Sequence, residues 1–277
     1  MKKFLVFANE IKDKDLVVTK KLCAMLEERG KEWVMAEQDE NHAMKADSIP
    51  EDIDCVVVLG GDGSFIAVAR NIWKLEIPIL GVNLGTLGYL TEVEVKDLEK
   101  ALDRILTLDY YIEERMMLKA ECSTGDVEFA LNDVVFNRRG GLRVAHFSVY
   151  VNDELLTSYE ADGVILSTPT GSTAYNRSAG GPIVKPSANC IIVTPICPHD
   201  TSVGSIVLDG KDEVTVVVDK GRRGEIDRMN VNLDGARSVS VETGDWVRVH
   251  KTRVGTKIIK LNSSSFIETL RSKLKGN

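Results

Sequence analysis

One stretch of this chain strongly limits how the chain can fold. The apolar residues 55–59 break into Gly60-Gly61-Asp62-Gly63, and a helix-like segment, residues 65–73, follows directly. Glycine lets the backbone turn sharply and approach a ligand, and a helix N-terminus presents unpaired N–H groups to phosphate oxygens. The pattern therefore predicts a buried strand, a phosphate-binding turn and a helix, with an ordinary hairpin turn as the alternative. Since Asp62 is an anion, we expect it to act on a proton or a metal ion rather than on phosphate.

Size, charge and cysteine usage exclude several classes of protein. A chain of 277 residues with 43% hydrophobic content suits two domains or one large one. The net charge of −7 argues against a nucleic-acid binder, which needs clustered cations. None of the five cysteines forms a CxxC pair, so we expect reduced thiols in a cytoplasmic protein. No apolar run approaches the length that spans a membrane, and we expect no membrane partner.

The pattern of strands and helices changes after residue 108. Before it, strand and helix patterns alternate, which favours a parallel sheet covered by helices. After it, short strand patterns dominate and helical spacing is nearly absent, which suggests a mostly antiparallel β domain. These strands are expected at residues 110–122, 127–137, 144–151, 164–167, 190–194, 214–218 and 246–250. Helical spacing returns at residues 264–274, where we expect a helix that packs back onto one of the domains.

A loop rich in hydroxyl groups is the second motif. Residues 162–175 read as a short strand that runs into Ser167-Thr168-Pro169-Thr170-Gly171-Ser172-Thr173, and a brief helix is expected at residues 172–178. Hydroxyls and loop N–H groups are neutral donors that suit phosphate and ribose oxygens. Ordinary surface-turn chemistry is the alternative for this loop.

Two further motifs have both a functional and a structural interpretation. Asn132-Asp133 lies inside the apolar strand 129–136, where a polar pair is costly unless it finds partners. A ligand with amide or hydroxyl groups would supply such partners, and a bulge or strand end is the alternative. The glycine-rich turn at residues 81–90 could serve a ligand or only interrupt the chain. Of four histidines without metal spacing, only His199 merits a test.

Known phosphate-binding and kinase patterns are absent from the sequence. It contains no GxxxxGK[ST] loop, because Gly30-Lys31 and Gly210-Lys211 are followed by acidic residues. It also contains no GxGxxG fingerprint and no protein-kinase signature set. If this chain is a phosphotransferase, it binds phosphate through none of these three known sequence motifs.

The motifs at residues 60–63, 83–90, 132–133 and 162–178 occur in one order that closely resembles the NAD kinase family of bacterial type. The resemblance covers residues 4–266 and implies an α/β plus all-β protein. It implies a Rossmann-like α/β domain at 1–108, a β-sandwich domain at 109–253, and a C-terminal strand and helix at 254–277 that return to the N-terminal domain. Family members form homo-oligomers, either dimers or tetramers.

The resemblance also implies a reaction and its participants. The γ-phosphate of ATP, or in some members of polyphosphate, is transferred to the 2′-hydroxyl of the adenosine ribose of NAD, with a divalent metal, normally Mg²⁺. The family's proton acceptor matches Asp62. Contacts to NAD are expected from Asp62, Gly63, Asn132, Asp133, Arg143, Glu160, Asp162, Thr173, Ala174, Tyr175, Asn176, Arg177 and Ser178. Contacts to the phosphates of ATP are expected from Gly60, Gly61, Gly63, Ser64, Thr170, Gly171 and Ser172.

This chain departs from the family pattern in three places. Gly204-Ser205 stands where many members have Arg-Pro, Ala236 where many have glutamine, and Glu160 where several bacterial members have a basic residue. These departures affect secondary ligand contacts, oligomer packing or the choice of phosphoryl donor. They leave the Asp62 region unchanged.

Several alternatives remain open from the sequence. Asp62 either accepts the proton of the attacking hydroxyl or holds the metal ion. A lipid kinase or a phosphofructokinase-like enzyme would share the glycine-rich turn, although the hydroxyl loop and the lack of an arginine cluster speak against each. A non-catalytic dinucleotide sensor would keep the binding loops without needing a carboxylate at Asp62.

Overall fold

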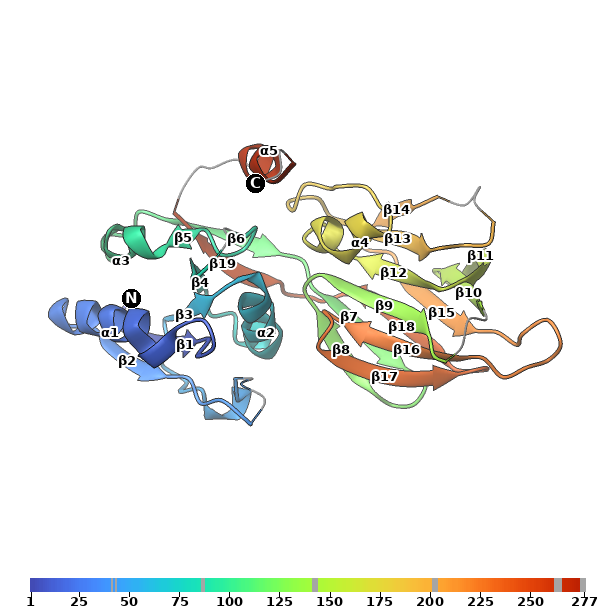
Figure 1. The fold of residues 1–277 in the computed structure, drawn as a ribbon, viewed down its shortest axis with the longest axis horizontal. Coiled ribbons are helices and arrows are strands. Elements are labelled where there is room, and N and C mark those ends of the chain that lie inside the picture. The colour runs from blue at the N-terminus through green and yellow to red at the C-terminus, as the bar shows by residue number, and fades with distance from the viewer. Residues whose placement is uncertain are drawn as a thin grey trace. The chain divides into compact units, whose positions relative to one another are not determined.

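The computed structural model describes residues 1–40, 42, 44–85, 88–140, 144–200, 204–261 and 266–274 (Figure 1). The chain divides into two compact units. The first comprises Met1–Glu114 and Gly255–Asn277, and the second comprises Arg115–Val254. The first unit therefore takes in both ends of the chain, and the second is one continuous insertion.

The first unit contains a seven-stranded sheet in the order β2-β1-β3-β4-β19-β6, with β5 paired to β4. All register pairs described among β1, β2, β3, β4, β5 and β19 are parallel. The strands are β1 (Lys3–Ala8), β2 (Glu32–Met35), β3 (Cys55–Gly60), β4 (Ile79–Asn83), β5 (Val93–Glu94), β6 (Tyr111–Arg115) and β19 (Thr256–Lys260). The helices are α1 (Val17–Glu28), α2 (Asp62–Ile72), α3 (Leu98–Leu106) and α5 (Phe266–Leu274). This arrangement confirms the α/β fold predicted for the N-terminal part.

The helices of the first unit bury the apolar faces that their sequence periodicity defines. In α2, the buried side chains are Phe65, Val68, Ala69 and Ile72, spaced for one face of a helix. Strand β3 is buried along its whole length, as expected for a parallel strand covered on both faces. Near the end of the chain, the ring of Phe266 lies 6.4 Å from that of Tyr89, so α5 contacts the loop after β4.

The second unit is a β-sandwich of two six-stranded sheets, in which all described pairings are antiparallel. The first sheet has the order β11-β10-β15-β18-β7-β8, and the second has the order β14-β13-β12-β9-β16-β17. One hydrophobic core joins residues of both sheets, such as Phe147 and Val216 of the first with Phe136 and Leu166 of the second. The predicted combination of an α/β and an all-β part is thus confirmed.

The elements of the second unit have these bounds. The first sheet is built from β7 (Leu118–Cys122), β8 (Val127–Ala130), β10 (Ala145–Val151), β11 (Glu154–Ala161), β15 (Val214–Val218) and β18 (Trp246–Lys251). The second is built from β9 (Asp133–Arg138), β12 (Gly163–Ser167), β13 (Cys190–Ile196), β14 (Ile206–Asp209), β16 (Arg228–Leu233) and β17 (Arg237–Glu242). The short helix α4 (Tyr175–Ser178) follows β12 after a 3₁₀ turn at Gly171–Thr173.

Two strands that the sequence predicts as continuous are broken in the structure. Residues 110–122 form β6 and β7, which belong to different sheets. Residues 127–137 form β8 and β9, and the chain crosses from one sheet of the sandwich to the other at Leu131 and Asn132. The prediction of one strand through Asn132 was therefore wrong, because the apolar pattern does not reveal which sheet each half joins.

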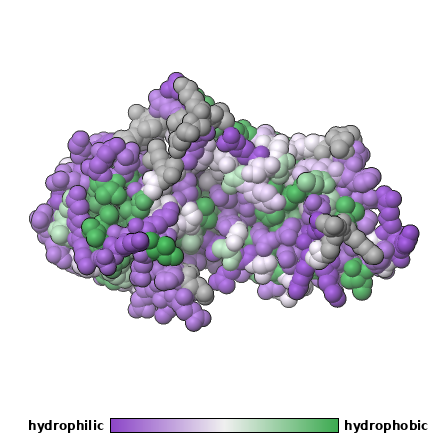
Figure 2. All heavy atoms as spheres, in the orientation of Figure 1, coloured by the Kyte–Doolittle hydropathy of each residue, from purple (hydrophilic) through white to green (hydrophobic). Residues whose placement is uncertain are grey.

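Hydrophilic residues cover most of the visible surface of each unit, and hydrophobic residues appear there in separate areas (Figure 2). None of the helices in the described ranges is long and apolar enough to cross a membrane. The five cysteines are all free, and all but Cys197 are buried.

Candidate active site

The glycine-rich turn lies where β3 passes into α2. Gly61 is the N-cap residue of α2, in an extended conformation, and Asp62 is the first residue of the helix. A Cβ atom on Gly60 would lie 2.6 Å from both Cβ and Oγ of Ser64, so this close approach requires glycine. The predicted strand, turn and helix are confirmed, and the N-terminus of α2 is presented at the carboxyl end of a parallel strand.

The carboxylate of Asp62 is held by the loop that follows β4. One oxygen accepts from the N–H of Tyr89 at 2.7 Å. The other accepts from the N–H of Leu90 at 3.1 Å, and from the N–H and hydroxyl of Thr91 at 3.1 and 3.0 Å. A Cβ atom on Gly88 would lie only 1.8 Å from Oδ1 of Asp62. The glycine-rich turn of residues 81–90 therefore binds the acid rather than only interrupting the chain.

This arrangement has a chemical consequence for Asp62. An ionised carboxyl group offers about four lone-pair sites, and the loop supplies four donors. Three of them go to Oδ1 and one goes to Oδ2, so Oδ2 keeps a lone pair for a hydroxyl group. The loop thus fixes the carboxylate in place.

A polar pocket of about 440 Å³ lies in the second unit, at the break between β8 and β9. Asparagine, aspartate and tyrosine side chains from the start of α4, from β9 and β16, and from the residues next to these strands surround it. The lining residues are Asn132, Asp133, Val135, Asn137, Ala174, Tyr175, Asn232, Asp234 and Gly235. Asn132, Asp133, Ala174 and Tyr175, which the sequence predicts as ligand contacts, are thus brought together.

Asp234 holds the break between the two strands. Its carboxylate accepts from the N–H groups of Leu131 at 2.8 Å, Asn132 at 2.8 Å and Asp133 at 3.1 Å. Asp234 itself has a positive φ of 50°, which a residue other than glycine seldom adopts. The backbone N–H groups freed by the strand break are therefore paired by a side chain about a hundred positions further along the chain.

Asp133 is the most perturbed acid of this pocket. Its side chain is 5% exposed, and no hydrogen bond to its carboxyl group occurs within the described residues. Burial, and then the charge of Asp234, raise the pKa of Asp133 to about 7. A buried carboxyl group without a hydrogen-bond partner favours a ligand as the missing partner.

The hydroxyl-rich loop at residues 167–173 is hydrogen-bonded to the strand break that borders this pocket. Thr168 donates through its hydroxyl to the carbonyl of Leu131 at 2.7 Å and through its N–H to that of Asn132 at 2.8 Å. A Cβ atom on Gly171 would lie 2.1 Å from the carbonyl oxygen of Asn132. The hydroxyl of Ser172 donates to the carbonyl of Pro169 at 2.7 Å. In this structure these groups hold the loop against the strand break.

The remaining expected contacts lie outside this pocket. Asp162 forms an ion pair with Arg138, with Nε and Oδ1 2.6 Å apart. Thr173, Asn176, Arg177 and Ser178 lie in or beside α4, where Asn176 is fully buried and accepts from the hydroxyl of Thr194 at 2.7 Å. Arg143 lies outside the described residues.

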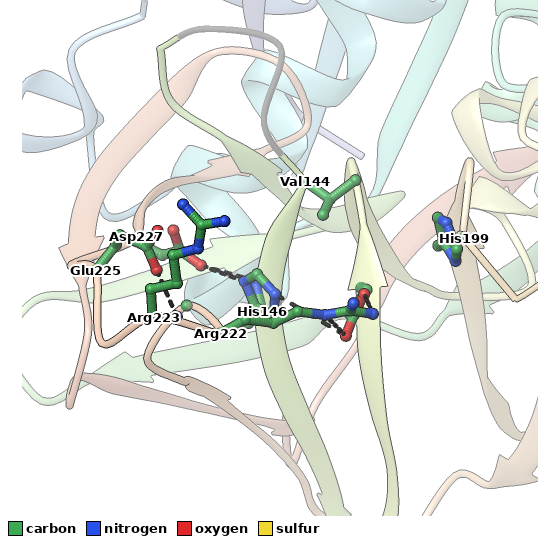
Figure 3. Close-up of a pocket in the computed structure, with 9 residues that line it drawn as sticks. Val144, His146, His199, Arg222, Arg223, Glu225 and Asp227 are labelled. Carbon is green, nitrogen blue, oxygen red and sulfur yellow. Dashed lines mark hydrogen bonds and ion pairs between the residues drawn. The ribbon is translucent and has the colours of Figure 1, made fainter.

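Glu160 lines a second pocket of the sandwich, of about 340 Å³ (Figure 3). It accepts two hydrogen bonds from the guanidinium of Arg222, at 2.9 and 2.7 Å, and this contact lowers the pKa of Glu160. Nδ1 of His146 lies 2.8 Å from the carboxylate of Asp227. His199 also borders this pocket but lies apart from that pair (Figure 3).

Three residues that line the 440 Å³ pocket were not identified from the sequence. Asn137 and Asn232 face the 440 Å³ pocket from paired strands, and the amide of Asn232 donates to that of Asn137. Asp234 was not among the expected contacts. Polar residues at alternate positions of β9 and β16 were the available signal, but they are typical of any solvent-facing strand.

Residues 4–111 match the family model described as the ATP-NAD kinase N-terminal domain, and residues 131–261 match that of the ATP-NAD kinase C-terminal domain. The chain is 39% identical over 281 residues to an NAD kinase of Lachnoclostridium phytofermentans, which covers 99% of both chains. It is 42% identical over 284 residues to an NAD kinase of Agathobacter rectalis, with 100% of this chain and 99% of the relative covered.

Two solved structures share the fold. Yeast NADH kinase complexed with NADH has a TM-score of 0.86 and 24% sequence identity, over 100% of this chain and 88% of the yeast chain. An NAD kinase from Archaeoglobus fulgidus in complex with ATP has a TM-score of 0.81 and 24% identity, over 99% of both chains. At this identity the two structures establish the similarity of fold alone.

Proposed function

The chain belongs to the NAD kinase family, and on that premise we propose that it transfers the γ-phosphate of ATP to the 2′-hydroxyl of the adenosine ribose of NAD, giving NADP. The observation that carries this conclusion is the match to both domains of the family along nearly the whole chain. The enzyme is a phosphotransferase with an alcohol as acceptor. The glycine-rich turn with Asp62 and the polar pocket at Asn132 supply the two kinds of site that this reaction needs.

In this proposal Asp62 accepts the proton of the 2′-hydroxyl as the oxygen attacks the γ-phosphorus. An alcohol is a poor nucleophile, and a carboxylate within hydrogen-bond reach removes its proton as the new bond forms. Four donors from the loop at residues 89–91 fix the direction of this carboxylate. The lone pair that remains on Oδ2 could accept the hydrogen bond of the hydroxyl.

Magnesium is the metal that we propose as cofactor. Within the described residues, no three His, Cys, Asp or Glu side chains form a group that could hold a metal ion. Mg²⁺ is usually bound by one or two carboxylates together with substrate phosphates and water, so it does not require such a group. When bound, the ion would neutralise part of the charge on the phosphates.

We propose the pocket between β8 and β9 as the NAD site. Its asparagine amides and carboxyl groups suit ribose hydroxyls and a carboxamide. Replacing Asn132 or Asp133 with alanine is expected to raise KM for NAD about tenfold and to change KM for ATP less, because a hydrogen bond to a bound ligand contributes roughly 1 kcal/mol or more.

Asn230→Ala is the matched control for this prediction. Asn230 lies on β16 as Asn232 does, but it accepts a hydrogen bond from Ser240 and does not line the pocket. Its removal should leave both KM values unchanged. Equal increases in the two KM values of the Asn132 or Asp133 variants would contradict the assignment of this pocket to NAD.

We further propose a cytoplasmic homo-oligomer, a dimer or a tetramer. The five free cysteines agree with a reducing compartment. Light scattering of the purified protein would give the number of subunits. The donor is proposed to be ATP, with inorganic polyphosphate as the second candidate.

One assay tests the function directly. Incubation with NAD, ATP and Mg²⁺ should produce NADP, and parallel reactions with NADH or polyphosphate define the acceptor and the donor. NAD binding without NADP formation would favour a dinucleotide sensor. Phosphorylation of a lipid or a sugar phosphate instead of NAD would show that the assignment is wrong.

A further inference from the structure

The loop between β1 and α1 is attached to the glycine-rich turn. The N–H of Asn9 donates to the carbonyl of Leu59 at 2.8 Å. The side-chain amide of Asn9 donates to the hydroxyl of Ser64 at 2.8 Å. The N–H of Lys12 in turn donates to the backbone carbonyl of Asn9 at 2.9 Å. The backbone of Lys12 is therefore fixed next to the N-terminus of α2.

The ammonium group of Lys12 lies directly over this turn. Its Nζ is 2.8 Å from the position that a Cβ atom on Gly61 would take, and Gly61 is the N-cap residue of α2. Among the described residues, no carboxylate forms an ion pair with Lys12. A cation at the positive end of a helix dipole is unfavourable unless an anion is also present. This placement favours an anionic ligand.

A buried amide on the other side of the turn gives an independent indication. Asn83, the last residue of β4, is 4% exposed and pairs in register with Gly60. Its Oδ1 accepts from the N–H of Gly85 at 2.7 Å, while its buried Nδ2 finds no hydrogen-bond partner in the described part of the chain. Because an unpaired buried donor is unfavourable, an acceptor from a ligand is expected there.

The two groups converge on one point of the loop. A Cβ atom on Gly85 would lie 3.9 Å from Oδ1 of Asn83 and 4.0 Å from Nζ of Lys12. The ammonium of Lys12, the side chain of Asn83 and the N-terminus of α2 thus lie around the same turn. The absence of side chains on Gly61 and Gly85 keeps the space between them open.

We propose that Lys12 and the side-chain amide of Asn83 bind the phosphate chain of the phosphoryl donor at the N-terminus of α2. This inference rests on the proposed function and assigns a charged residue to a site for which the sequence predicted only glycines and hydroxyl residues. A lysine acts as a point charge for phosphate, and its ammonium can follow the charge that develops on the transferred group. The ligand chemistry is a phosphoanhydride chain, whether from ATP or from polyphosphate.

Binding measurements on the full-length protein without NAD test this site. Lys12→Gln is expected to weaken the binding of ATP and of inorganic tripolyphosphate, measured by titration calorimetry, by about 10- to 100-fold, because a charge-assisted contact is lost. Lys12→Arg should retain most of the affinity. Weakening with both ligands indicates recognition of the phosphate chain itself, and weakening with ATP alone indicates the nucleotide as the source. Unchanged affinity for both ligands in Lys12→Gln would overturn the proposal.

Two further variants separate binding from folding. Lys20→Gln on α1 removes an exposed lysine away from the turn and should bind ATP as the wild type does. Asn83→Asp keeps the acceptor for Gly85 but replaces the amide donor with a charge, so it should also weaken ATP binding while the protein still unfolds cooperatively. If the wild type forms no NADP although Lys12→Gln still loses ATP affinity, the proposed function fails and the phosphate site stands. If NADP is formed but Lys12→Gln binds ATP normally, only this inference fails.

Discussion

Replacing Asp62 with asparagine is expected to lower kcat for NADP formation by about 10²- to 10⁴-fold, which is the usual contribution of one general base. Asparagine has nearly the same shape but cannot accept the proton of the 2′-hydroxyl. The proposed NAD pocket lies in the second unit and does not involve Asp62. The dissociation constant for NAD, measured by titration, should therefore stay close to that of the wild type.

Thr91→Val is the matched control for Asp62→Asn. It removes one of the four donors to the carboxylate, the hydroxyl at 3.0 Å, and leaves the acid itself in place. We expect kcat to fall by less than about tenfold, as for the loss of one hydrogen bond. Turnover of Asp62→Asn close to that of the wild type would contradict the assigned role. Recovery of that variant at high Mg²⁺ concentration would instead favour Asp62 as a metal ligand.

The site at Asp62 could be predicted in part because its main signal is local. A strand, three glycines and a helix follow one another in the sequence, and the structure places Asp62 at the start of α2 as expected. The loop that binds the carboxylate was not predicted, because Thr91 lies 29 positions further along the chain. Lys12 was missed for the same reason: its position depends on hydrogen bonds of Asn9 to two segments that are distant in sequence.

The strand break at Asn132 shows a second limit of sequence patterns. The apolar residues on both sides of the break are equally suited to one long strand. What separates them is pairing with different sheets, together with the three hydrogen bonds to Asp234. Alternation of apolar and polar residues shows that one face of a strand is buried, but it does not show which strands lie beside that strand.

The departure at Glu160 gains a physical explanation from the structure. Where the family resemblance leads one to expect a basic residue, Glu160 accepts two hydrogen bonds from the guanidinium of Arg222. A guanidinium from another part of the chain is therefore present beside this position. A sequence comparison at one position reports a loss of charge, whereas the folded protein has an ion pair there.

Asp133→Asn is expected to stabilise the protein against unfolding, and more strongly at pH 8 than at pH 5. The pKa of Asp133 is raised from 3.8 to about 7 in the folded protein. The folded state therefore holds the proton more tightly than the unfolded chain, and stability is lost as the pH rises between these two values. The full penalty, present above about pH 7, is on the order of 4 kcal/mol, and asparagine avoids it because it carries no charge.

Urea denaturation at several pH values would measure this effect. The gain in unfolding free energy of Asp133→Asn should increase by about 2 to 3 kcal/mol between pH 5 and pH 8. In this range the wild-type carboxyl group is ionised in the unfolded chain, whereas in the folded protein it stays largely protonated up to about pH 7. Asp153→Asn, in the exposed turn between β10 and β11, is the control and should show a gain that does not change with pH.

The free-energy cost of ionising the buried Asp133 points to a role for this residue in ligand binding. A carboxyl group that destabilises the fold at neutral pH persists where a ligand supplies the hydrogen bonds that the protein does not. NAD should therefore raise the unfolding temperature of the wild type more than that of Asp133→Asn at pH 8. An equal shift in both proteins would show that NAD binding does not depend on this carboxyl group. A stabilisation by Asp133→Asn that is the same at pH 5 and pH 8 would show that the group carries no buried charge.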